Sequence, residues 1–275
     1  PPGTQLSGDP RDLALGDLDG DGILDAVVAT CYGIDLLPGA GREGFRERSS
    51  RTNIMQPTAV VLADLDGDGR RDVVAAVAGN GSGMSGPVFV YRNGPDGLDG
   101  GTTYPVDFLE YEARLQPGAI AAGDFDGDGH PDVAIVDWGN KQERGLSIAL
   151  LKGAGDGTLG PPVWRRLAPG TTNPKFGLAE GRVGLLAADL DGDARPDLAL
   201  ASPAGTFVVL GPGGATPQVL SHPGAGTSVA AADLDGDSLP DLAVAGFGED
   251  LPCKDEDGLD ATCQPVRVFA NGGAG

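Results

Sequence analysis

The chain has 275 residues, with 40 acidic and 19 basic side chains, and its formal net charge is -21. A charge this negative opposes binding to the phosphate backbone of nucleic acids, and no apolar run approaches the roughly 20 residues that span a bilayer. Nucleic-acid binding and a membrane span are therefore not expected. The 40% of hydrophobic residues, arranged in short runs of Val, Ala and Leu, indicates a folded chain.

Short apolar runs and acidic loops alternate along the chain. A run of small residues at 13–16 leads into an acidic loop that begins at Asp17, and β-prone runs follow at 25–30 and 34–39. The same order recurs with acidic loops that begin at 64, 124, 189 and 233, and a less regular stretch closes each unit. Apolar runs of this length are typical of strands, and helical periodicity is almost absent. Each unit therefore predicts three clear strands and one weaker strand.

Four strands in about 55 residues is the size of a propeller blade. We therefore predict an all-β fold, a β-propeller of four-stranded blades, as a single domain over residues 1–275 with five repeats. The small first strand of each unit suits the crowded axis of a narrow ring. The segment before Leu13 is expected to supply the outer strand of the last blade, whose third strand is 266–272, because this closes the ring and removes exposed sheet edges. An open array or a fragment of a larger ring is the alternative.

The acidic loops share the pattern D-x-D-G-D-x-x-x-D. Two carboxylates about 4 Å apart repel by roughly 4 kcal/mol at an effective dielectric near 20, so these aspartates either splay into solvent or share a cation. Oxygen ligands at positions 1, 3, 5 and 9, with the backbone carbonyl of position 7, suit Ca²⁺ better than Mg²⁺ or Zn²⁺. The predicted ligands of about five Ca²⁺ ions are Asp17, Asp19, Asp21, Ile23 and Asp25; Asp64, Asp66, Asp68, Arg70 and Asp72; Asp124, Asp126, Asp128, His130 and Asp132; Asp189, Asp191, Asp193, Arg195 and Asp197; and Asp233, Asp235, Asp237, Leu239 and Asp241.

An EF-hand loop starts in the same way but needs a bidentate glutamate at position 12. That position is apolar in all five copies and lies inside the following β-prone run, so each loop is predicted to be a hairpin calcium site. Position 6 is glycine in the first three copies, as a left-handed turn prefers, but Ala194 and Ser238 take its place in the last two. Those two sites are expected to bind more weakly. Solvated acidic turns without metal are the alternative.

Two features predict a location outside the cell. Weak calcium sites need about 10⁻⁴ to 10⁻³ M free calcium, which the cytosol does not supply. Cys253 and Cys263 bracket an acidic insertion and are candidates for a disulfide, which fits an oxidising compartment. Cys31 is expected to be a small buried hydrophobe. The abundance of Arg, Ala, Gly and Pro is typical of a bacterial protein.

The D-x-D-G-D-G-x-x-D loop between two strands, followed by V-x-V-x-x-N-G-x-G, resembles the FG-GAP or VCBS repeat, which integrin α-subunit propellers also contain. The resemblance covers essentially the whole chain. It implies a calcium-binding propeller whose ligands bind on the face opposite the calcium loops. On that face Trp138, Asn140, Lys141 and Arg144 combine an aromatic plate with hydrogen-bonding groups, and we expect them to bind the ligand. Ordinary exposed loop residues are the alternative.

No catalytic motif fits its structural context. The G-x-G-x-x-G match at 155–160 precedes Pro161-Pro162, which forbid the helix that a dinucleotide site needs, and G-x-S-x-G is absent. We expect no enzyme, but an extracellular adhesion or ligand-binding module for a protein or a glycan. One alternative is a structural subunit of a surface assembly, in which the propeller packs against copies of itself. Another is an accessory propeller of a secreted polysaccharide-active enzyme.

Overall fold

The computed structural model describes the chain except for residues 1–4, 52–53, 55, 79–85, 107–116, 138–145, 168–182, 203–204, 212–217, 221–225, 247–250, 255–259, 264–265 and 272–275. Strands form nearly all of the regular structure in the described part, and the one helical element there is a 3-10 turn at Gly41–Glu43. The prediction of an all-β fold is confirmed. The described residues include no helix with the length and apolar character that a membrane crossing requires.

The strands form five antiparallel sheets in chain order, which we call the first to fifth blades. The first blade contains β1 (Pro10–Gly16), β2 (Asp25–Thr30), β3 (Gly33–Leu37) and β4 (Ser49–Arg51). The second contains β5 (Pro57–Ala63), β6 (Asp72–Val77), β7 (Val88–Tyr91) and β10 (Thr102–Tyr104), with a small hairpin of β8 (Asn93–Gly94) and β9 (Gly97–Leu98) before β10.

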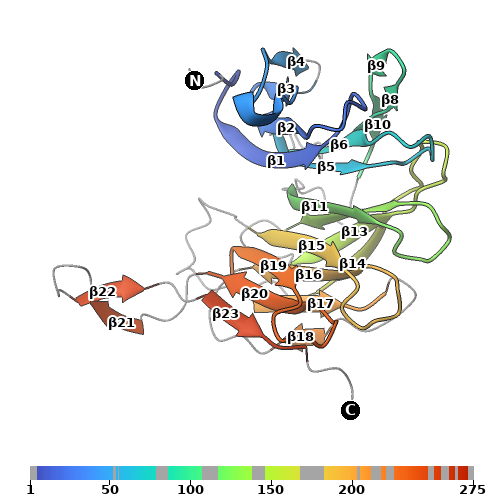
Figure 1. Cartoon of the computed structure of the whole chain (residues 1–275). Helices are drawn as coiled ribbons and strands as arrows, with labels where there is room; N and C mark the ends of the chain where they lie inside the picture. The colour runs from blue at the N-terminus through green and yellow to red at the C-terminus, as the bar shows by residue number, and fades with distance from the viewer. Residues whose placement is uncertain are drawn as a thin grey trace.

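The third blade contains β11 (Pro117–Gly123), β12 (Asp132–Asp137), β13 (Ser147–Leu151) and β14 (Val163–Arg166). The fourth contains β15 (Gly184–Ala188), β16 (Asp197–Ser202), β17 (Gly205–Val209) and β18 (Gln218–Leu220). The fifth has three described strands, β19 (Ser228–Ala232), β20 (Asp241–Ala245) and β23 (Val266–Phe269). The insertion between β20 and β23 forms a separate hairpin of β21 (Leu251–Lys254) and β22 (Asp260–Cys263), which projects from the blades in Figure 1.

The blades follow one another as an arc, and their first strands pack side by side in the order β1, β5, β11, β15 and β19 (Figure 1). Small residues allow this approach. A Cβ atom at Gly184 of β15 would lie 2.7 Å from the Cα of Ser228 in β19, which is closer than atoms tolerate. The prediction that the first strand of each unit is small because it lies on a crowded axis therefore agrees with the packing.

The hydrophobic core lies between neighbouring blades. The second strands β2, β6, β12 and β16 are buried at every residue. Neighbouring sheets cover both faces of β6, β12 and β16, whereas β2 packs on the second blade with one face and on Leu6 with the other. Val74 and Val90 of the second blade, for example, pack with Ile120 and Ile135 of the third. Each blade therefore depends on its neighbours for the burial of its apolar faces, as repeat architectures do.

The N-terminal segment does not pair with the last blade in the described part of the chain, so the prediction that it closes the ring is corrected. β1 is the inner strand of the first blade, and the residues just before it stay on that blade. The backbone N–H of Ser7 donates to Asp35 Oδ2, and the N–H of Cys31 donates to the carbonyl of Asp9 at 3.1 Å. Leu6 packs on the apolar face of the same blade. These local contacts hold the segment on the first blade, at the opposite end of the arc from β23.

Candidate metal-binding loops

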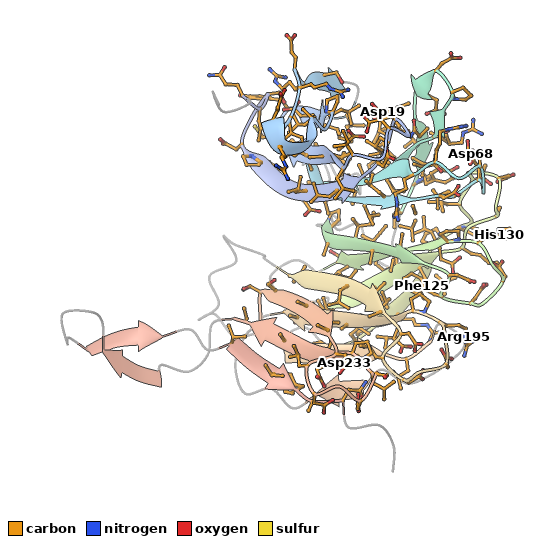
Figure 2. The ribbon with its side chains drawn as sticks, in the orientation of Figure 1. Asp19, Asp68, Phe125, His130, Arg195 and Asp233 are labelled. Carbon is orange, nitrogen blue, oxygen red and sulfur yellow. The ribbon has the colours of Figure 1, made fainter. Side chains whose placement is uncertain are left out.

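The five acidic loops join the first strand of each blade to its second strand. Because every blade repeats the same connection, the loops lie along one side of the arc. Figure 2 shows this arrangement through Asp19, Asp68, His130 and Arg195, which follow one another along that side. Tertiary structure thus places all five predicted clusters at equivalent positions, one in each blade.

The first aspartate of each loop organises the turn through backbone hydrogen bonds. In the first loop the N–H groups of Gly20 and Gly22 donate to the two oxygens of Asp17, each at 2.8 Å. Corresponding bonds recur in the other loops, with Asp68 as the first donor in the second loop. The residue at position 6 has positive φ in every loop, including 69° at Ala194 and 76° at Ser238. The predicted left-handed turn is therefore confirmed, and the last two loops adopt it without the glycine that favours it.

The last aspartate of each loop connects three strands of its blade. In the third loop Asp132 is buried, and it accepts hydrogen bonds from the N–H of Phe125 at 3.1 Å and from the N–H of Gly153 at 2.8 Å. Phe125 belongs to the loop itself, whereas Gly153 follows the third strand. The same two acceptor bonds recur at the equivalent residues Asp25, Asp72, Asp197 and Asp241.

Sequence reasoning assigned the ninth position to metal alone and did not identify this second role. The available signal was the second residue after each third strand, where the sequence has a glycine or an asparagine. Its N–H is the second donor to the aspartate in every blade, through Gly39, Asn93, Gly153, Gly211 and Asn271. The ninth aspartate is thus a structural residue as well as a candidate ligand.

Each loop gathers carboxylate oxygens closely enough for one ion to contact them. One oxygen from each of three aspartates lies within 4.8 Å of the other two. Positions 1, 3 and 9 form this group in four loops, and positions 1, 3 and 5 form it in the second loop. The groups are Asp17, Asp19 and Asp25; Asp64, Asp66 and Asp68; Asp124, Asp126 and Asp132; Asp189, Asp191 and Asp197; and Asp233, Asp235 and Asp241.

The aspartate at position 5 contacts a basic side chain in four loops, including the second loop, where it also belongs to the carboxylate group. Arg46 Nη2 lies 3.3 Å from Asp21 Oδ2, and Lys152 Nζ lies 3.0 Å from Asp128 Oδ2. Lys152 also contacts Asp126, while the side chains of Arg70 and Arg195 contact Asp68 and Asp193 of their own loops. In the described part of the chain, no basic side chain contacts Asp237 of the fifth loop.

Two of these basic neighbours favour the ionised form of the aspartate that they contact. The side-chain hydrogen bond from Lys152 lowers the pKa of Asp128, and the bond from Arg195 lowers the pKa of Asp193. Three of the ninth positions differ, because desolvation raises the pKa of Asp72, Asp132 and Asp197. Repulsion from the other carboxylates of the same loop raises the pKa of these three groups further. In the fifth loop, the backbone hydrogen bonds from Asn271 and Leu234 lower the pKa of Asp241.

The donor set fits a hard cation. The clusters contain only carboxylate oxygens, with no imidazole nitrogen or thiolate, and a divalent ion would offset the repulsion among them. His130 stands at position 7, where its N–H donates to Asp128 Oδ1 at 2.9 Å. The proposed carbonyl ligands of position 7, namely Ile23, Arg70, His130, Arg195 and Leu239, remain predictions, as does the identity of the ion.

The other candidate residues lie partly outside the described residues. Trp138, Asn140, Lys141 and Arg144 all lie outside the described residues. The flanking strand ends, Asp137 of β12 and Ser147 of β13, are at the end of the third blade opposite its acidic loop. For Cys253 and Cys263 the backbone register is known: Cys253 pairs with Ala261, and Cys263 pairs with Leu251. Their disulfide remains a prediction.

Two further expectations concern Cys31 and the glycine-rich match at 155–160. Cys31 is a free thiol of intermediate exposure, so it is less buried than expected. The glycine-rich match forms a turn with an isolated bridge between Gly153 and Leu159, and the strand β14 follows it. The structure therefore confirms that no helix follows this match, as a dinucleotide site would require.

Comparison with known proteins supports this architecture. The family model of the FG-GAP-like repeat matches residues 17–75, 64–135, 124–200 and 189–244. No protein in the comparison with curated proteins matches the chain. Among solved structures, a lectin of Agrocybe aegerita that recognises non-reducing terminal N-acetylglucosamine is 22% identical with a TM-score of 0.51, and the match covers 89% of this chain and 66% of that chain.

A structure of BBS1N in complex with ARL6DN is 14% identical with a TM-score of 0.51, and the match covers 89% of this chain and 63% of that chain. At these identities the likeness concerns the fold, which is the β-propeller predicted from the repeats. The chain spans slightly less than two thirds of the length of either structure.

Proposed function

Since the chain belongs to the FG-GAP-like repeat family, we propose that it is an extracellular, calcium-stabilised propeller that binds a protein or glycan ligand. The acidic loops hold Ca²⁺ on one side of the blades, and the loops at the opposite end contact the ligand. The protein has no catalytic role in this proposal.

The observation that carries the proposal is the fivefold recurrence of one carboxylate cluster. A single group of exposed acidic residues is common without a metal, but here every loop gathers three carboxylate oxygens within 4.8 Å. In four of these groups a buried aspartate supplies one of the oxygens. Desolvation raises the pKa of two of these aspartates, Asp132 and Asp197, so a nearby cation would stabilise their charged forms. Ca²⁺ accepts such oxygen-rich, irregular sites.

Extracellular location and calcium binding support each other. Sites made of carboxylates on exposed hairpin loops are expected to be weak, with dissociation constants of about 10⁻⁴ to 10⁻³ M, which suits calcium levels outside cells. The candidate pair Cys253 and Cys263 agrees with an oxidising compartment.

Calcium binding is tested by isothermal titration and by metal analysis of the calcium-loaded protein. We expect close to five ions per chain, because five loops carry the cluster, and weaker binding at the loops that contain Ala194 and Ser238. A stoichiometry of two or fewer would contradict the proposal. Titration with Mg²⁺ under the same conditions distinguishes a calcium preference from general attraction to the negative charge.

A glycan array and a protein pull-down test the ligand. The propeller fold also serves a lectin that recognises terminal N-acetylglucosamine, so glycans with this terminus are the first probes. We expect Trp138→Ala and Arg144→Ala to abolish binding, while Trp164→Ala, on the outer strand β14 of the same blade, leaves it intact. Binding that survives both loop substitutions would move the ligand site elsewhere. Turnover of a polysaccharide would favour the enzymatic alternative instead.

A further inference from the structure

Asn93 of the second blade contacts two acidic loops at once. It is 4% exposed and stands two residues after the third strand β7. Its backbone N–H donates to Oδ1 of Asp72, the ninth position of its own loop, at 2.8 Å. Its side-chain Nδ2 donates to the carbonyl of Leu18 in the first loop at 2.6 Å. One buried residue therefore joins the loop of its own blade to the loop of the preceding blade.

The contact in the first loop lies within its carboxylate group. Leu18 stands at position 2, between Asp17 and Asp19, and both of these aspartates belong to the group. The N–H of Leu18 also donates to Oδ2 of Asp25, the third member, at 2.7 Å. The residue that accepts the Asn93 amide is therefore bonded to, or next in the chain to, all three candidate ligands of the first loop.

The contact in the second loop reaches the carboxylate group through Asp72. This aspartate accepts the N–H of Asn93 with one oxygen and the N–H of Leu65 with the other, the latter at 2.9 Å. Leu65 stands between Asp64 and Asp66, which both belong to the group of the second loop. An unbroken series of hydrogen bonds therefore runs from one candidate metal site to the next.

The same link recurs between the fourth and fifth loops. The N–H of Asn271 donates to Oδ1 of Asp241 at 2.7 Å, and its Nδ2 donates to the carbonyl of Leu190 in the fourth loop. The N–H of Leu190 in turn donates to Oδ2 of Asp197 at 2.9 Å. Two asparagines at equivalent positions thus make the same two contacts.

Glycine replaces the asparagine in the other three blades. Its backbone N–H keeps the bond to the ninth aspartate, but it has no side chain that could reach the preceding loop; these residues are Gly39, Gly153 and Gly211. The second and third loops are joined instead through the backbone, since the N–H of Gly157 donates to the carbonyl of Leu65 at 3.0 Å. The link through an asparagine is therefore specific to two pairs of loops.

We propose that Asn93 and Asn271 couple calcium binding between neighbouring loops, so that the first and second loops bind cooperatively, as do the fourth and fifth. The inference rests on the proposed calcium binding. An ion that orders one loop also holds its ninth aspartate, and the asparagine bonded to that aspartate then holds the backbone between two ligands of the preceding loop. That loop has less conformational freedom left to lose when its own ion binds, which gives positive cooperativity without a change of fold.

Calcium titration of the ¹⁵N-labelled full chain, followed by nuclear magnetic resonance, measures each loop separately. The amide signals of Gly22, Gly69 and Gly129 report the first, second and third loops, because these N–H groups donate to the first aspartate of their loop. Asp66→Asn disables the second loop, since Asp66 belongs to its carboxylate group. We expect this substitution to raise the calcium Kd of the first loop at least about fivefold, the lower end of typical coupling between sites.

Asn93→Gly should abolish this effect. The variant keeps the backbone bond to Asp72, as the glycines of the other blades keep theirs, so it removes only the link between the loops. In this background Asp66→Asn should leave the Kd of the first loop unchanged.

The third and fourth loops provide the matched control, since Gly211 has no side chain to link them. Asp191→Asn removes from the fourth loop the same charge that Asp66→Asn removes from the second. The Kd of the third loop, read from the signal of Gly129, should stay unchanged. An effect as large as that on the first loop would assign the response to long-range charge and overturn the proposal.

Asn271→Gly tests the same link in the other pair of loops, and it decides the question if Asn93→Gly fails to fold. Here the signal of Gly192 reports the fourth loop, and Asp235→Asn disables the fifth. A Kd of the first loop that ignores Asp66→Asn, or that responds equally in Asn93→Gly protein, would overturn the coupling and leave calcium binding in place. Glycine signals that do not respond to calcium would contradict calcium binding itself, and the coupling with it.

Discussion

Replacing Asp132 with alanine should destabilise the calcium-free protein, whereas replacing Asp126 in the same loop should not. Asp132 is buried and accepts the N–H groups of Phe125 and Gly153, which are themselves buried. Alanine at position 132 leaves both donors without a partner in a site that water does not reach. Asp126 is exposed and pairs with Lys152 at the surface.

The magnitudes separate the two variants. A buried donor without a partner costs about 1–3 kcal/mol, so two donors give about 2–6 kcal/mol. Burial raises the pKa of Asp132, which shows that its charge is itself costly to bury, and alanine removes that cost. The expected loss therefore lies in the lower half of the range. An exposed ion pair contributes about 0–1 kcal/mol, which bounds the effect of losing Asp126.

Urea denaturation in EDTA, followed by circular dichroism, measures the free energy of unfolding for wild type, Asp132→Ala and Asp126→Ala. In calcium, both variants should lose one bound ion, because positions 3 and 9 both belong to the cluster of this loop. Equal stability of the two variants in EDTA would refute the structural role of the ninth aspartate. It would leave that residue as a metal ligand alone.

Three other perturbations have defined outcomes. Chelating calcium from the wild-type protein should lower its melting temperature by tens of degrees, because each occupied site adds about 2.7 kcal/mol to the free energy of unfolding at a hundredfold excess of calcium over Kd. A melting temperature unchanged by EDTA would mean that blade packing alone holds the fold. Ala194→Gly and Ser238→Gly should each raise the unfolding free energy by about 0.5–1 kcal/mol in urea, since both residues have positive φ, and titration should show tighter calcium binding. Desolvation raises the pKa of Asp12, so the folded chain holds this proton more tightly than the unfolded chain. Wild-type stability should therefore fall relative to Asp12→Asn as the pH rises from the ordinary aspartate pKa through the raised value, and parallel denaturation curves at all pH values would contradict this.

Local features of the fold could be predicted because each lies within a few consecutive residues. The nine residues of an acidic loop contain both the carboxylates that accept the turn's hydrogen bonds and the N–H groups that donate them. The turn therefore forms from its own sequence. Asp17, for example, bonds only to residues three and five positions ahead. The left-handed conformation at position 6 follows from that geometry, even where alanine or serine stands in place of glycine. The small inner strands and the four-strand repeat were readable for the same reason, since each unit repeats its own pattern.

Tertiary structure alone decided the features that join distant segments. The second N–H donor to Asp132 is that of Gly153, and the ammonium group that contacts Asp128 is that of Lys152. Both residues follow the end of β13, which is distant in sequence from the acidic loop. The N-terminal segment had two apolar surfaces available, those of the first and of the last blade, and the structure places Leu6 on the first blade. Closure of a ring depends on the sum of small rotations between neighbouring blades. No single repeat encodes that sum, so the sequence specifies each blade and each junction, while the packed chain determines how the blades follow one another as an arc.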